Sequence, residues 1–161
     1  YDQMWDVTAN LPAVLVLESN GYEFTGGAHG MPFTASLIWD RAAGKRLATG
    51  DILDKNRLTL TARDSFCAEL NRQREEKRGA PVDPAAKDGI AEFNQCPVLA
   101  EHEIIPLSRK GKALDIVRVV IGPYAAGPYA EGSYEIDLPV TPEILAAVKP
   151  AYRGWFSTGT P

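Results

Sequence analysis

Apolar residues in this chain come in short runs, and glycine, proline and polar turn residues separate one run from the next. The longest runs, such as Ala13–Leu17 and Val117–Ile121, have the length of a β-strand. None approaches the ~20 apolar residues that a membrane-spanning helix requires. Because short strands joined by turns pair most readily with their neighbours in the sequence, the pattern predicts antiparallel sheet and no membrane span.

Strands are predicted near both ends of the chain. Leu11–Glu18 mixes aliphatic and β-branched residues, Ser19–Gly21 predicts a break, and Tyr22–Phe24 resumes the alternation. Apolar and acidic residues alternate in Ser133–Val140, so one face of that strand is expected to be buried. The other predicted strands are Phe33–Trp39, Ile104–Leu107 and Leu114–Ile121.

The middle of the chain predicts a helix. Thr61–Asp64 matches a capping box, in which the threonine hydroxyl and the aspartate carboxylate bind free backbone amides. Ala62, Phe66 and Leu70 follow at helical spacing and form one apolar stripe. The helix is therefore expected to begin near Thr61 and to pack through that stripe.

Beyond the stripe, Asn71–Arg78 is wholly polar and is expected to run over the surface until Gly79 ends the helix. Asp83–Pro84 predicts the start of a second helix, with proline at its first position. Ile90 and Phe93 would anchor that second helix to the core.

Thr141–Glu143 predicts a third, short helix that extends through Val148. Strands at both ends and helices between and after them predict an α+β fold, with an antiparallel β-sheet packed against two to three helices. At 161 residues, the chain is expected to form a single domain over residues 1–161.

The charge balance disfavours nucleic-acid binding. The chain has 17 basic and 21 acidic residues and a formal charge of -4, whereas a protein that neutralises phosphates needs a basic stripe. A mildly acidic surface would suit a cationic protein partner.

Recognisable catalytic and metal motifs do not occur in the sequence. His102-Glu103 begins like a zinc-protease helix, but Pro106 occupies the position of the second histidine and would break such a helix. Nucleophile elbows and phosphate-binding or dinucleotide-binding loops do not occur either. We therefore expect no metal and no cofactor.

His29 is the one residue in a chemically plausible setting for catalysis, because the glycines around it could expose its ring. Its nucleophile would have to be Ser36, Ser133 or Ser157, and nothing in the sequence selects one. The alternative is a structural histidine in a loop that needs glycine for its backbone. We expect no catalytic residues and treat an enzyme as the alternative.

Two loops are candidates for binding. The first contains Gly26, Gly27, His29 and Gly30 between predicted strands. The second, Gly122–Gly132, repeats Gly-Pro-Tyr-Ala and carries the binding candidates Tyr124 and Tyr129. Tyrosine is enriched at binding hot spots, although Pro-Tyr segments also fold their rings back over a sheet edge.

Cys67 and Cys96 are too few for a disulfide framework. A bridge between them would stabilise the fold by about 3–4 kcal/mol. Two buried free thiols would serve equally well as small apolar residues, so the residues alone leave both alternatives open.

Taken together, these motifs resemble the DUF3298-like C-terminal domain of RsiV-type, lysozyme-binding anti-sigma factors, which also occurs beside peptidoglycan deacetylase domains. The resemblance rests on Gly26–Gly30 between two strands, on Thr49-Gly50 and Leu58–Leu60 after it, and on the late Pro123–Pro128 loop. These pieces occur in the family's order between about residues 11 and 148.

The resemblance implies an antiparallel α+β domain in the periplasm or otherwise outside the cytoplasmic membrane, where a Cys67–Cys96 disulfide can persist. It also implies a module that binds or senses lysozyme-like wall hydrolases or peptidoglycan, and it supplies no catalytic residues. The alternatives are an envelope glycan or ester hydrolase that uses His29, and a structural accessory domain. Because the chain begins with Tyr1, a trimmed precursor is expected, and a lipid anchor in that precursor is an open alternative.

Overall fold

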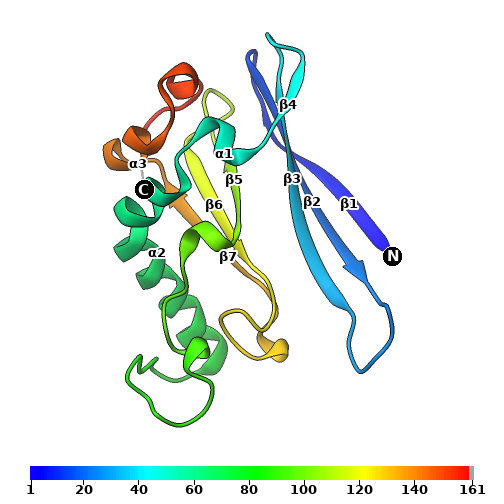
Figure 1. Ribbon diagram of the computed structural model, residues 1–161, viewed down its shortest axis with the longest axis vertical. Coiled ribbons are helices and arrows are strands. Elements are labelled where there is room, and N and C mark those ends of the chain that lie inside the picture. The colour runs from blue at the N-terminus through cyan, green and yellow to red at the C-terminus, as the bar shows by residue number, and fades with distance from the viewer. Residues whose placement is uncertain (160–161) are drawn as a thin grey trace.

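The computed structural model describes residues 1–159, which form three layers (Figure 1). A four-stranded sheet, the first sheet, lies against one face of a three-stranded second sheet, and the long helix α2 covers the other face of the second sheet. This arrangement confirms the predicted α+β class with antiparallel sheets and a few helices. Among residues 1–159, no helix is both long and apolar enough to cross a lipid bilayer.

The first sheet is an antiparallel meander in the order β1 (Asp2–Asn10), β2 (Val14–Glu23), β3 (Met31–Asp40) and β4 (Lys45–Leu47). Strand β1 was not among the predicted strands. The alternation of Trp5, Val7 and Ala9 with polar residues is a strand signal that could have identified it.

The predicted break at Ser19–Gly21 is wrong, because β2 continues through it. Ser19 is buried and accepts a hydrogen bond from Gln3 Nε2 at 2.6 Å. Gly21 lies opposite Phe33, and a Cβ atom at Gly21 would be 2.3 Å from the Phe33 ring. The glycine therefore makes room for an aromatic ring on the neighbouring strand instead of forming a turn.

The outer face of the first sheet, which points away from the second sheet, is apolar. Trp5 on β1 and Trp39 on β3 are 47% and 39% exposed there. The other apolar residues that share this face by register are Val7, Leu15, Leu17, Phe33, Ala35 and Leu37. An apolar face of this extent is larger than the isolated hydrophobic residues common on protein surfaces.

The second sheet has the order β5 (Glu103–Leu107), β6 (Ile116–Ile121) and β7 (Tyr134–Pro139), all antiparallel. The three strands predicted in this part of the chain are confirmed. Since the sheet is the middle layer, β6 is buried on both faces, which explains its nearly continuous apolar sequence.

Helix α2 (Lys55–Arg78) begins earlier than predicted. Its N-cap is Asp54, whose carboxylate accepts a hydrogen bond from the Arg57 amide. Thr61 lies inside the helix, and its hydroxyl donates to the Arg57 carbonyl, so the capping-box pattern is not used. The predicted apolar stripe is buried against the second sheet, and Gly79 ends the helix with φ 65 as expected.

The predicted helix at Asp83–Pro84 does not form. The segment consists of turns up to a 3₁₀ helix at Ala91–Phe93, and Ile90 is 53% exposed instead of buried in the core. The Asp83 carboxylate accepts a hydrogen bond from the Ala85 amide, so Pro84 is the central residue of an Asx turn, and no helix continues from it.

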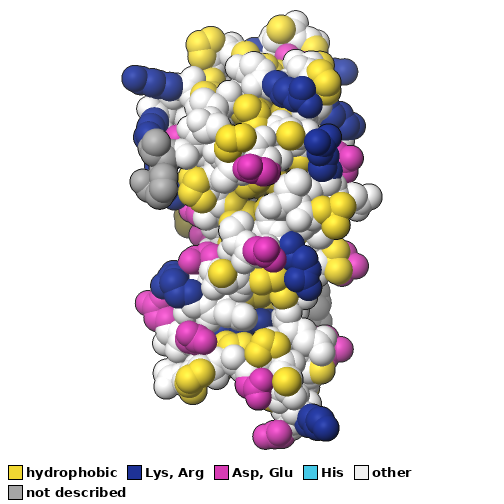
Figure 2. Space-filling model, turned by 90° about the vertical axis from the view of Figure 1, so that its left-hand side faces the viewer, with side chains coloured by type: hydrophobic (Ala, Val, Ile, Leu, Met, Phe, Trp, Pro, Cys, Tyr) yellow, Lys and Arg dark blue, Asp and Glu magenta, His cyan; other side chains and the backbone are white. Residues whose placement is uncertain are grey.

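The remaining helices are short. Helix α1 (Thr49–Ile52) precedes α2, and α3 (Pro142–Ala147) confirms the predicted C-terminal helix, with Thr141 as its N-cap. Further 3₁₀ helices span Leu99–Glu101, Tyr129–Glu131 and Pro150–Trp155. Figure 2 shows basic and acidic side chains interspersed over the helix-bearing side of the molecule.

The two sheets are joined by an apolar contact and a buried ion pair. Val14, Val16 and Ile38 of the first sheet are fully buried against the second. Further along β2, the buried carboxylate of Glu18 accepts a hydrogen bond at 3.0 Å from Arg118 on β6. Arg118 also forms a bidentate pair with Asp137 at 2.7 and 3.0 Å.

Cys67 on α2 and Cys96 form a disulfide, as the resemblance implied. The bridge ties the segment after α2 back to the helix across a sequence separation of 29 residues. Replacing both cysteines with alanine should lower the free energy of unfolding by about 3 kcal/mol, because the unfolded chain regains the entropy of an open loop. Urea denaturation would measure the loss, and equal stability of the variant and the wild type would contradict the prediction.

Replacing Arg118 with methionine should lower the free energy of unfolding by about 3–5 kcal/mol, because Glu18 would remain buried without its charged partner. Arg72→Met is the matched control, since Arg72 pairs with Glu69 and Glu76 at the surface, and it should cost less than about 1 kcal/mol. Urea denaturation of both variants checks this. Equal losses would show that the pair between the sheets adds nothing beyond a surface pair.

Candidate binding site

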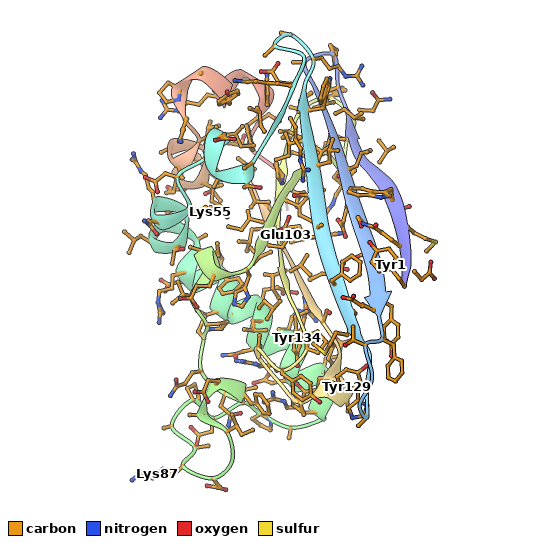
Figure 3. All side chains as sticks on the ribbon, turned by 45° about the vertical axis from the view of Figure 1, so that its right-hand side comes forward. Tyr1, Lys55, Lys87, Glu103, Tyr129 and Tyr134 are labelled. Atoms are coloured by element: carbon orange, nitrogen blue, oxygen red, sulfur yellow. A yellow bond between two sulfur atoms is a disulfide. The ribbon has the colours of Figure 1, made fainter. Side chains whose placement is uncertain are left out.

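The two predicted binding loops meet at one end of the molecule. We call Gly26–Gly30 the glycine loop and Gly122–Gly132 the tyrosine loop. The His29 ring stacks on the Tyr129 ring, with centroids 4.3 Å apart and planes 16° from parallel. Tyr124 lies 5.6 Å from Tyr129 in a tilted arrangement. Residues about 100 positions apart in the chain thus form one aromatic cluster, and Figure 3 labels Tyr129 within it.

Gly30 links the two loops through its backbone. The Tyr129 hydroxyl donates to the Gly30 carbonyl at 2.8 Å, and the Gly30 amide donates to the Tyr22 hydroxyl at 3.0 Å. A Cβ atom on residue 30 would lie 2.3 Å from the Tyr22 ring, so only glycine allows this approach. Tyr22, at the end of β2, was missed because nothing in its short segment indicated a partner in a distant loop.

Gly26 and Gly27 have a different role from Gly30. Their φ angles are 106 and 96, a region that side chains disfavour, and the space around them is open. They turn the chain between β2 and β3 and leave His29 exposed at the end of the sheet. Tyr124 also has a positive φ of 68 and is 48% exposed. A bulky residue held in that conformation is typical of a functional loop.

The C-terminal half of α2 holds the tyrosine loop in place. Arg74 is fully buried, and its guanidinium donates to the Ala126 carbonyl at 2.9 Å and to the Glu92 carbonyl at 3.2 Å. The expectation that Asn71–Arg78 only covers surface is therefore wrong at Arg74. An arginine that satisfies loop carbonyls replaces hydrogen bonds that an irregular loop cannot make within itself.

Glu131 forms a second anchor for the tyrosine loop. It accepts hydrogen bonds from Arg78 Nε at 2.7 Å and from the Tyr134 hydroxyl. Burial raises the pKa of the Glu131 carboxyl, but the hydrogen bonds from Arg78 and Tyr134 outweigh it and hold the pKa below its usual value. Burial and the bond to Glu131 raise the pKa of Tyr134 to about 12, so this phenol stays a donor at neutral pH.

Partial desolvation and the neighbouring Tyr22 hydroxyl raise the pKa of Tyr129 above its ordinary value. Its hydroxyl therefore remains protonated and keeps donating to the Gly30 carbonyl. A hollow of about 230 Å³ lies between the sheets beside the loops, and its lining includes Pro32, Thr34, His102 and Ser133. The site thus combines an exposed aromatic cluster with an adjoining polar hollow.

This arrangement favours binding through ring stacking. Within residues 1–159, no hydrogen bond joins the His29 side chain to Ser36, Ser133 or Ser157, and the Ser36 hydroxyl instead donates to Glu103 at 2.6 Å. No group of three His, Cys, Asp or Glu side chains over the same residues is placed to hold a metal ion. Aromatic rings fixed by hydrogen bonds offer a preorganised contact surface that loses little entropy on binding.

Glu131→Gln should remove an acid-dependent part of the stability. Because folding lowers the pKa of Glu131 from 4.5, its contribution is complete above that pH and is lost as the pH falls through the folded value. The difference in unfolding free energy between wild type and variant should therefore be largest near neutral pH and shrink below about pH 4. Urea denaturation across this range measures it, and a difference independent of pH would contradict the prediction.

No protein-family model matches the sequence, and no curated protein matches it. A solved DUF3298 family protein from Pseudomonas aeruginosa PAO1 shares 23% identity and a TM-score of 0.49 over 92% of this chain and 61% of its own. A DUF3298 family member from Bacteroides fragilis shares 21% identity and a TM-score of 0.57 over 95% of this chain and 56% of its own. The chain thus spans less than two thirds of each. At this level of identity, the likeness to the Bacteroides structure shows that the two chains share a fold.

Proposed function

We propose that the chain is a DUF3298-type domain that acts outside the cytoplasmic membrane as a binding module of the cell envelope. The fold shared with the Bacteroides DUF3298 family structure supports the family. The Cys67–Cys96 disulfide supports the compartment, because disulfides persist in oxidising surroundings.

The observation that carries the proposal is the aromatic cluster formed by His29, Tyr124 and Tyr129. Its rings come from two distant loops, and hydrogen bonds to Gly30 hold them together. Stacked, partly exposed rings beside a polar hollow suit the flat apolar faces and hydroxyl groups of sugar rings. Peptidoglycan is therefore the ligand we favour.

A second candidate ligand is a lysozyme-like wall hydrolase. The formal charge of -4 favours a cationic partner, and tyrosines are enriched at protein–protein hot spots. In this case the same cluster would contact a protein surface instead of a glycan. An enzyme that uses His29 is less well supported, since the ring stacks on Tyr129 without a hydrogen bond to a serine among residues 1–159.

Tyr124→Ala should weaken binding of soluble peptidoglycan fragments about tenfold or more, because it removes an exposed ring worth more than about 1.4 kcal/mol at a hot spot. Leu60→Ala is the matched control, since Leu60 is an exposed apolar residue on α2. Isothermal titration with the fragments and, in a parallel arm, with lysozyme measures both affinities.

Binding of the fragments that falls with Tyr124→Ala and not with Leu60→Ala would support the glycan. The same pattern with lysozyme alone would transfer the proposal to the protein partner. Wild-type protein that binds neither would refute the binding function.

A further inference from the structure

A second hollow, of about 410 Å³, lies beside β3 where β4 has ended. Its lining combines β3, β4, the start of α2 and the start of β5, and it includes Ser36, Arg46, Thr49, Lys55 and Glu103. Figure 3 labels Lys55 on α2 and Glu103 on β5. The hollow therefore lies where both sheets and the helical layer come together.

Two cations line this hollow. Arg46 is exposed, and its guanidinium donates to the Ser36 carbonyl at 3.2 Å, which holds it along the edge of β3. Lys55 is the first residue of α2. Neither side chain forms an ion pair with a carboxylate of residues 1–159. In a chain whose formal charge is -4, two such cations at one hollow favour an anionic group there.

The hollow also offers hydrogen-bond acceptors to hydroxyl groups. Ser36 Oγ donates to Glu103 Oε1 at 2.6 Å. A carboxylate has about four lone-pair sites, so Glu103 keeps the capacity to accept further hydrogen bonds. A simple anion such as phosphate would be repelled by this carboxylate, whereas a sugar acid brings a carboxylate for the cations and hydroxyls for Glu103.

The two hollows lie one after the other along β3, and the smaller one is nearer the two loops. Glu103 lines both this hollow and the smaller one beside the loops, and Pro32 and Thr34 line the smaller one. Pro32, Thr34 and Ser36 alternate along β3 and so face the same side, toward the second sheet. At about 3.3 Å per residue, they span roughly 13 Å, which is long enough for a chain of sugar rings and too long for a single ring.

We propose that the two hollows together form a groove that binds an acidic glycan strand. A sugar carboxylate would bind at Arg46 and Lys55, sugar hydroxyls would bind at Glu103, and the strand would continue toward Tyr129. This inference rests on the proposed glycan-binding function and specifies the chemical class of the glycan. On this proposal, the groove recognises the negative charge of the glycan, and the aromatic cluster stacks on its sugar rings.

The test uses the whole chain and an oligogalacturonate as the acidic glycan, with a neutral maltooligosaccharide of equal length and inorganic phosphate as comparison ligands. Isothermal titration should show that the acidic glycan binds at least about tenfold more tightly than either of them. Arg46→Ala and Lys55→Ala should each weaken its binding about tenfold, and added salt should weaken it further. Lys87→Ala removes an exposed lysine that lies at the lower tip in Figure 3, well below Lys55 and Glu103, and it should change nothing.

Four results would each overturn the groove proposal. The first two are equal affinity for the acidic and neutral glycans, and phosphate binding as tight as that of the acidic glycan. The other two are no measurable binding of the acidic glycan, and unchanged binding by both alanine variants. Titration with peptidoglycan fragments separates this failure from failure of the binding function. Binding that Tyr124→Ala weakens and Arg46→Ala does not would leave the function standing without the groove. Thermal melting confirms that each variant is folded.

Discussion

The packing of the first sheet on the second determines whether the candidate binding site can form. Each loop of the site belongs to a different sheet, so His29 meets Tyr129 only if the sheets keep their relative position. Apolar residues such as Val16 and Ile38 supply the contact area, but apolar packing is non-directional. The Glu18–Arg118 and Ser36–Glu103 hydrogen bonds have defined geometry, and they fix the position of β2 and β3 over β6 and β5.

Helix α2 holds the tyrosine loop in place from the opposite side of the second sheet. Arg74 and Arg78 reach from α2 to the tyrosine loop and to the segment near Glu92, and the disulfide holds that segment to the same helix. An irregular loop with two arginine anchors on one rigid helix has few alternative conformations. This restriction explains how Tyr124 is kept at a positive φ, because the surrounding bonds offset the strain.

The sequence allowed us to predict the features that depend on local patterns and not those that depend on distant partners. Alternation identified β7, short apolar runs identified β5 and β6, and Gly79 and Thr141 marked helix ends correctly. The glycine and tyrosine loops were identified as two separate candidates, and only the fold could show that they meet. Gly21 was misread because the Phe33 ring that requires it lies on another strand. Arg74 was misread because a buried arginine and a solvated one have the same local sequence, and the carbonyls that bind it lie 18 and 52 residues further along the chain.

A ligand that contacts both sheets is thermodynamically linked to their packing. Any molecule that binds the native arrangement, and not an arrangement in which the sheets have separated, stabilises the native one by mass action. The inner residues of β3 face Glu103 on β5, and the tyrosine loop continues from β6, so a ligand along this groove contacts both sheets at once. The groove crosses the interface next to the Ser36–Glu103 hydrogen bond. Ligand binding should therefore stabilise the packing of the two sheets, and tighter packing of the sheets should strengthen ligand binding.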